Sequence, residues 1–301
     1  MQFTGTHLRA VRCLPWLLLL LLTATALLCQ AEPLPVGKGS FQFTDTKVSP
    51  GKTLTVWYYA PAGLRPDSKV VFIMHGTDRN AEDYLDAWAA YAEKYGFLAV
   101  APQFSRQEFP QADYQFGGLR HPDKRQWTFP VIEHLFDEVR GKESLTTGRY
   151  YLYGHSAGAQ FVHRFMLFMP DPRVELAIAA NAGAYTLPVY PSGADAGFPW
   201  RLDQSLVSEA QLKNVFSRRL VVLLGGNDVN PNHKYLSHKR EAEAQGPYRL
   251  ARGEFFFRTA KEQASRMNTP FNWTIEVVPG VGHNNKRMSE AAVKYVVSGG
   301  K

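Results

Sequence analysis

The chain has 301 residues, of which 45% are hydrophobic and 20% are charged, and its formal net charge is +7. Lysines and arginines are scattered rather than gathered into a stripe, so the composition argues against a nucleic-acid-binding protein and we expect no nucleic-acid partner. Both cysteines, Cys13 and Cys29, fall within the first 31 residues. A chain that loses those residues has no disulfide, no thiolate metal site and no cysteine nucleophile.

Residues 1–31 have the layout of a secretory signal peptide. Arg9 and Arg12 precede an apolar run that begins at Leu14, and small residues close the segment before Glu32. A membrane anchor is the alternative, but the run is interrupted by threonines and is shorter than the roughly 20 residues that a span needs. A lipid anchor on Cys29 is disfavoured by the bulky leucine before it. We therefore expect an exported protein, secreted or periplasmic, without stable membrane insertion after cleavage.

Residues 32–301 predict a single catalytic domain of the α/β class. Two segments that flank Pro50-Gly51 predict an antiparallel hairpin at the start. After the hairpin, short apolar runs alternate with amphipathic segments, which is the pattern of a mostly parallel sheet with helices on both faces. The expected strands are 69–76, 97–104, 150–156, 176–184, 220–228 and 273–280, and the expected helices are 80–95, 127–139, 157–169, 255–267 and 289–297.

Two long stretches, 106–125 and 185–202, fit neither pattern. Both follow the carboxyl end of an expected strand, where open α/β sheets place their ligand sites. Loops of this length in a compact domain usually have a function, although they can also be plain surface connections. The aromatic residues that we expect to line a substrate pocket are Tyr114, Phe116, Tyr185 and Trp200.

The segment Gly154-His155-Ser156-Ala157-Gly158 lies between an expected strand and an expected helix. This is the setting of a nucleophile elbow, a tight and strained turn that needs glycine neighbours and lifts a serine to the edge of the sheet. The free N–H groups of the helix N-terminus favour negative charge there. The alternative is that Ser156 only caps the helix. The context predicts that Ser156 is a nucleophile.

A serine nucleophile needs a base, and the base needs an orienting carboxylate. Of nine histidines, His283 stands in a glycine-containing loop between the last strand and the last helix. Asp228 ends the strand 220–228, between the serine and the histidine in the chain. The residues from Asp228 also mimic a calcium loop, but His233 and Lys239 replace the glycine and the glutamate that such a loop requires. We expect no metal site.

Two backbone N–H groups are expected to form an oxyanion hole. One belongs to Ala157, directly after the nucleophile, and the other belongs to Thr77, in the loop after the first parallel strand. Each such donor contributes about 3 kcal/mol to stabilisation of the transition state.

Together these motifs resemble the α/β-hydrolase family over residues 40–300. The resemblance rests on HGT at 75–77, GHSAG at 154–158, GGND at 225–228 and GVGH at 280–283, in the family order of serine, aspartate and histidine. Among its members the chain looks most like secreted esterases of the polyhydroxybutyrate-depolymerase and feruloyl-esterase kind, because HGT is followed by Arg-Asn-Ala-Glu-Asp-Tyr. It departs from them in its lack of cysteines and of a polymer-binding module, and in a long insertion at 229–250.

The resemblance implies a serine hydrolase that needs no cofactor and cleaves carboxylic esters through an acyl-enzyme. Short-acyl, aryl or polyester-type esters, small or polymeric, are the expected substrates. A serine peptidase of the same fold is the second hypothesis, and a non-catalytic binding protein on a hydrolase scaffold is the third. The sequence does not fix the oligomeric state.

Overall fold

The computed structural model describes residues 1–2, 5, 32–48 and 52–299. The predicted signal peptide and the turn at Pro50-Gly51 lie outside the described residues. Among the residues that are described, no helix is both long enough and apolar enough to traverse a bilayer.

Within these residues an eight-stranded sheet has the order β1-β2-β4-β3-β5-β6-β7-β8. The first two strands form an antiparallel hairpin that pairs with β4, and the other pairs are parallel. The strands are β1 Gly37–Thr44, β2 Thr53–Ala60, β3 Val70–Met74, β4 Leu98–Gln103, β5 Tyr150–His155, β6 Val174–Ala180, β7 Leu220–Gly225 and β8 Trp273–Val278. The central strands β3, β5 and β7 are buried at every position, whereas the edge strand β1 alternates. This contrast is expected when both faces of a parallel sheet are covered.

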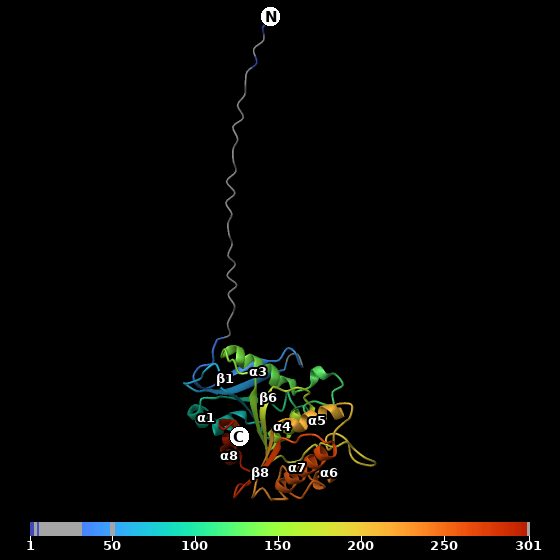
Figure 1. The fold of residues 1–301 in the computed structure, drawn as a ribbon. Helices are drawn as coiled ribbons and strands as arrows, with labels where there is room; N and C mark the ends of the chain where they lie inside the picture. Colours follow the sequence, from blue (N-terminus) through green and yellow to red (C-terminus); the bar gives the residue numbers. More distant parts are fainter. Residues whose placement is uncertain (3–4, 6–31, 49–51, 300–301) are drawn as a thin grey trace. The chain divides into compact units, whose positions relative to one another are not determined.

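Helices cover both faces of the sheet (Figure 1). They are α1 Ala81–Tyr95, α2 Gln111–Tyr114, α3 Pro130–Lys142, α4 Ala157–Phe168, α5 Glu209–Ser217, α6 Arg240–Glu243, α7 Arg249–Arg266 and α8 Asn285–Val297, with a 3₁₀ turn η1 at Lys124–Gln126. One apolar cluster contains Trp88 of α1 and Met288 of α8. The opposite cluster contains Phe136 of α3, Phe161 of α4 and Phe256 of α7. The α/β fold predicted from the sequence is confirmed.

The helices differ from the prediction in several places. Helix α8 begins at Asn285 instead of residue 289, α3 spans Pro130–Lys142 instead of 127–139, and the short helices α2 and α6 were not predicted. Two further differences have a clear physical cause. Helix α7 begins at Arg249 instead of residue 255, because its first turns bury Arg249 and Arg252, and charged residues at buried positions conceal the apolar period. Helix α5 was not predicted, although Leu212, Val215 and Phe216 form a buried stripe along it. Because the helix is short and otherwise polar, these three residues are the only part of its sequence that indicates a helical period.

Candidate active site

Ser156 occupies a strained turn between β5 and α4. Its backbone angles are φ 58° and ψ −114°, and its N–H donates to the Ala180 carbonyl over 2.9 Å. A Cβ added to Gly158 would lie 2.0 Å from the Met74 carbonyl oxygen, and one added to Gly154 would lie 2.4 Å from the Gly158 backbone. The helix therefore meets the sheet too closely for any side chain at either glycine.

The structure brings Ser156, His283 and Asp228 together. The His283 Nε2 atom lies 3.0 Å from the Ser156 hydroxyl oxygen, and its Nδ1 atom lies 2.7 Å from a carboxylate oxygen of Asp228. The Asp228 side chain is 2% exposed and the His283 side chain is 13% exposed. In the tautomer that donates from Nδ1, His283 can accept the serine proton at Nε2. Strands β5, β7 and β8 deliver the three residues at one edge of the sheet.

Arg249 is a further charged residue at this site. Its Nη1 atom lies 3.5 Å from Asp228 Oδ1, the carboxylate oxygen that His283 does not use, and its Nη2 atom donates to His233 Nδ1 over 3.2 Å. Burial lowers the pKa of the Arg249 guanidinium, and the Asp228 carboxylate opposes that shift. Arg249 was not predicted as a site residue, because residues 229–250 have the character of an inserted loop in the sequence, whereas Arg249 begins helix α7.

Two further imidazoles pack against the His283 ring. The His155 ring centroid lies 4.5 Å from it and the His233 centroid lies 5.0 Å from it. Burial, followed by the charges of His283 and Arg249, lowers the pKa of His155 well below its usual value. The pKa of His233 is lowered by burial and by Arg249. His155 thus contacts the His283 ring, although it was not predicted to be part of the site.

Thr77 and Ala157, the expected oxyanion donors, both line the cavity next to Ser156. Ala157 is the first residue of α4, so its N–H has no acceptor inside the helix. The loop that carries Thr77 is held by His75, whose Nδ1 lies 3.0 Å from the Gly76 carbonyl and whose Nε2 accepts from the Phe104 N–H over 3.0 Å. Burial lowers the pKa of His75 to about 3, so the ring is neutral at pH 7.

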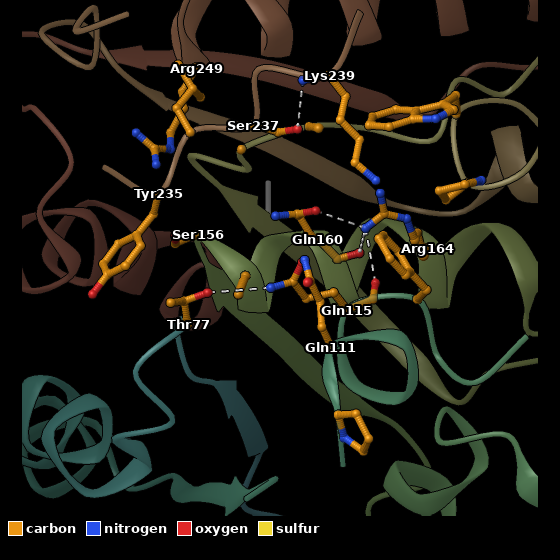
Figure 2. Close-up of a pocket in the computed structure, with 18 of the residues that line it drawn as sticks. Thr77, Gln111, Gln115, Ser156, Gln160, Arg164, Tyr235, Ser237, Lys239 and Arg249 are labelled. Carbon is orange, nitrogen blue, oxygen red and sulfur yellow. Dashed lines mark hydrogen bonds between the residues drawn. The ribbon is translucent and has the colours of Figure 1, made fainter. Parts of the chain in front are cut away.

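The cavity at Ser156 has a volume of about 570 Å³ (Figure 2). Of the four aromatic residues expected there, Phe116 and Trp200 line it. Tyr114 and Tyr185 are fully buried beneath it. Tyr114 donates to the His75 carbonyl over 2.7 Å, and Tyr185 stacks on Phe256 at 4.4 Å. Their rings support the loops that form the site and offer no surface to a substrate.

The cavity is strongly basic, which the sequence analysis did not predict. Among the described residues that line it, seven are arginine or lysine and none is aspartate or glutamate. The basic residues are Arg79, Arg106, Arg120, Arg164, Lys234, Lys239 and Arg249. Gln160 and Arg164 follow Ser156 at intervals of four residues on α4, so helix periodicity alone places all three on one face. This spacing in the sequence could have predicted that Gln160 and Arg164 lie on the same side of α4 as Ser156.

No group of three or more histidine, cysteine, aspartate or glutamate side chains in the described part of the chain is placed to hold a metal ion. The polar groups beside Ser156 are instead a base, backbone donors and cations. Such an arrangement supports nucleophilic attack on a carbonyl and stabilises the negative charge that develops.

The known proteins that this chain resembles are hydrolases, which agrees with the chemistry that the site supports. The structure matches that of poly(aspartic acid) hydrolase-1 from Sphingomonas sp. KT-1 with a TM-score of 0.82 and 39% identity, over 87% of this chain and 99% of that one. It matches the poly(3-hydroxybutyrate) depolymerase of Bordetella parapertussis with a TM-score of 0.82 and 31% identity, over 88% and 90% of the two chains. An S-formylglutathione hydrolase of Agrobacterium tumefaciens shares the fold at 16% identity and a TM-score of 0.58.

Among curated proteins, a bifunctional acetylxylan esterase/xylanase of Neocallimastix patriciarum is 27% identical over 124 residues. That match involves 40% of this chain and only 17% of the length of the relative. No family model matches the chain.

Proposed function

Since the chain belongs to the α/β-hydrolase family of serine hydrolases and esterases, we propose that it is an exported carboxylic ester hydrolase whose catalytic residues are Ser156, His283 and Asp228. The observation that carries this proposal is the His283 ring, which contacts both the Ser156 hydroxyl and the Asp228 carboxylate. Export rests on the character of residues 1–31.

In the proposed reaction, His283 Nε2 takes the proton of Ser156 as the serine oxygen attacks the ester carbonyl. The N–H groups of Thr77 and Ala157 stabilise the oxyanion of the tetrahedral intermediate. His283 then protonates the departing alcohol, which leaves an acyl group on Ser156. A water molecule that gives a proton to His283 attacks this acyl-enzyme, and His283 returns that proton to the Ser156 oxygen as the acid is released. Asp228 keeps the imidazole in the required tautomer throughout.

We propose short-acyl, aryl or polyester-type esters as substrates, either small or polymeric. The names of two relatives, a poly(3-hydroxybutyrate) depolymerase and an acetylxylan esterase, support an ester with a short acyl unit. Phe116 and Trp200 line the cavity and offer flat apolar surface to an aryl or chain-like group.

Amide hydrolysis is the second candidate. It is favoured by the relative with 39% identity, which is named a poly(aspartic acid) hydrolase. The same serine, base and oxyanion donors can cleave an amide, provided that His283 delivers its proton to the leaving nitrogen. The two candidates differ in the leaving group and not in the acyl-enzyme.

The test is a hydrolysis panel of aryl acetates, polyesters, peptides and polyamides with the purified chain and with Ser156→Ala. We expect ester cleavage by the native chain. The variant should keep its fold and lose up to about 10⁶ of the rate, the usual cost of a missing triad nucleophile. Retention of more than about one per cent of the activity would contradict the role of Ser156. Cleavage of polyamides without any ester activity would favour the second candidate.

A further inference from the structure

Arg164 is a fully buried guanidinium on the α4 helix, two turns after Ser156. All of the hydrogen-bond acceptors that it contacts are neutral. Its Nε donates to the Thr186 hydroxyl over 2.8 Å, and its Nη1 donates to the carbonyls of Gln115 and Gln160 over 3.0 and 3.2 Å. The aromatic ring of Phe116 lies 4.7 Å from the guanidinium carbon. A buried charge of this kind normally requires a counter-ion.

In the part of the chain that the structure describes, no carboxylate forms an ion pair with Arg164. Burial lowers the pKa of Arg164 to about 9, with no acidic group to oppose the shift, so it is still charged at pH 7. No acceptor is found for its Nη2 atom within residues 52–299. Arg164 is fully buried but is among the residues that line the cavity, and Nη2 is the nitrogen of its guanidinium that has no acceptor there.

Lys239 adds a second cation to this wall. Figure 2 shows its side chain running from the 235–239 segment toward Arg164. Both residues line the cavity, together with five other basic residues and, among the described lining residues, no acidic one. Positive charges gathered in a concave site raise the local concentration of an anion and hold it after binding.

From this arrangement we propose that the cavity beside Ser156 binds a substrate that carries carboxylates, and that Arg164 and Lys239 are the residues that select it. The inference rests on the proposed function, because it assigns a substrate class to the same hydrolytic site. A carboxylate is the appropriate anion because it can accept from the Arg164 Nη2 and from the Lys239 ammonium group at once. Of the other five basic residues, Arg249 lies 3.5 Å from Asp228 and Arg106 lies 3.9 Å from Asp78. The remaining three, Arg79, Arg120 and Lys234, favour a molecule with more than one carboxylate.

A purely structural role for Arg164 makes a different prediction. Its bonds to Thr186 and Gln115 tie α4 to two neighbouring segments. If that were its whole role, its replacement would slow neutral and anionic substrates equally. Lys239 provides a second position for the test. It is exposed, and its side chain forms no ion pair in the described part of the chain. A substitution of Lys239 is expected to leave the fold intact.

The test compares pairs of esters in which a free carboxylate is replaced by its methyl ester, with each rate divided by the rate of hydroxide-catalysed hydrolysis of the same compound. The first pair is the para-nitrophenyl ester of adipic acid with its second carboxyl group free or blocked as the methyl ester. The second pair, with the charge on the alcohol side, is para-acetoxybenzoate and its methyl ester. In at least one pair, kcat/KM should be about tenfold higher for the free acid, the value of one hydrogen bond to a charged group. The absence of any preference in both pairs would overturn the proposal.

Charge-reversal variants then locate the effect. Lys239→Glu should reduce the preference for the free acid to about unity or below, mainly through a higher KM. Arg164→Met should do the same if it folds. The control is Lys261→Glu, which changes the net charge equally at an exposed position of α7, about 18 Å along the helix from Arg249. An unchanged preference in Lys239→Glu, or an equal loss in Lys261→Glu, would contradict a local carboxylate site.

A binding measurement separates this inference from the proposed function. Calorimetry on Ser156→Ala needs no turnover, and adipate should bind at least about tenfold more tightly than adipamide. A chain that hydrolyses none of the esters but binds adipate in this way would contradict the proposed function and support the anion site. A chain that hydrolyses charged and neutral esters equally, and binds adipate no better than adipamide, would overturn the anion site alone.

Discussion

The buried guanidinium of Arg249 lies 3.5 Å from Asp228, at the carboxylate oxygen opposite the one that contacts His283. The aspartate is therefore held from both sides, by a cation at Oδ1 and by an imidazole at Oδ2. Arg249 touches none of the reacting atoms, so it is a positioning residue in the proposed mechanism. It fixes the rotation of the carboxylate and thereby the direction of the His283 ring.

We expect Arg249→Met to lower kcat by about tenfold to a hundredfold and the free energy of unfolding by about 3 kcal/mol, because it leaves a buried carboxylate short of one partner. Arg249→Lys should recover part of both losses. The pH dependence of kcat distinguishes positioning from simple instability. A misoriented Asp228 stabilises the imidazolium less, so the acidic limb of the profile should move in Arg249→Met at a temperature where the variant is folded. An unmoved profile would contradict the positioning role.

His283, rather than His233 or His238, is expected to be the catalytic base. All three follow Asp228 in the chain, but only His283 contacts both Ser156 and Asp228. His233 accepts from Arg249 instead, and His238 lies beside Glu243 on the surface. Alanine variants of the three should be compared by kcat with one aryl acetate. His283→Ala should lose at least about 10⁴ in rate, whereas the other two should stay within about tenfold. An active His283→Ala would overturn the assignment.

Gly158 is expected to be indispensable for the fold of the elbow. An added Cβ would lie 2.0 Å from the backbone carbonyl of Met74, and backbone atoms cannot move aside as a flexible side chain can. Gly158→Ala should therefore cost at least about 3 kcal/mol in denaturant unfolding, at the upper end of overpacking effects. The matched control is Gly141→Ala in α3, where nothing lies within 4 Å of the added atom. That change should be neutral or stabilise the protein by up to about 1 kcal/mol.

The site residues that could be predicted from the sequence differ physically from those that could not. Ser156, Asp228 and His283 stand at strand ends with glycines nearby, and such local turn chemistry is visible in a one-dimensional pattern. Arg164 and Arg249 act through burial and through partners far along the chain. Arg249 follows Asp228 by 21 residues, and only the packing of α7 against β7 shows that the two side chains meet. The contact of Arg249 with Asp228 therefore leaves no local signal, whereas the helical spacing of Arg164 from Ser156 does show that the two share one face of α4.

The aromatic residues illustrate the same limit. Tyr114 and Phe116 are separated by a single residue, yet Phe116 lines the cavity and Tyr114 is buried beneath His75. Tyr114 ends the short helix α2, and its direction depends on a stack with His75 at 4.5 Å and on the Arg79 guanidinium at 4.4 Å from its ring. Composition shows that the loop is aromatic, but the tertiary contacts decide which ring faces the substrate.

The buried histidines predict a loss of stability in acid. Burial lowers the pKa of His75 to about 3, below its usual value of 6.5, and it lowers the pKa values of His155 and His163 in the same direction. Between about pH 6.5 and pH 3 the unfolded chain binds a proton at His75 that the folded chain does not. The neutral His75 side chain therefore makes its full contribution to the free energy of unfolding above pH 6.5. As the pH falls from 6.5 to about 3, the protein loses stability on the order of 5 kcal/mol through this residue.

Thermal unfolding of the protein and of His75→Gln between pH 8 and pH 4 checks this prediction. At pH 8 the variant should be less stable, because the exchange disturbs the bonds to Gly76 and Phe104. Its melting temperature should nevertheless fall less steeply below pH 6.5 than that of the native chain, because one buried neutral base is missing. Parallel pH curves for the two proteins would show that His75 does not contribute.

The last prediction concerns the length of the acyl chain in neutral aryl esters. The cavity at Ser156 is lined by seven basic residues and three glutamines, which are interspersed with apolar residues such as Phe116, Trp200 and Leu236. A long aliphatic chain would have to lie along guanidinium and amide groups and would desolvate them without hydrogen bonds in return. Each added methylene that finds no apolar surface forfeits about 0.8 kcal/mol of possible burial. We therefore expect kcat/KM to peak at acetyl to butyryl and to decline for longer chains, measured as para-nitrophenyl release along a homologous series. A rate that climbs steadily to about twelve carbons would show that an apolar channel opens in solution, and would contradict a short-acyl specificity.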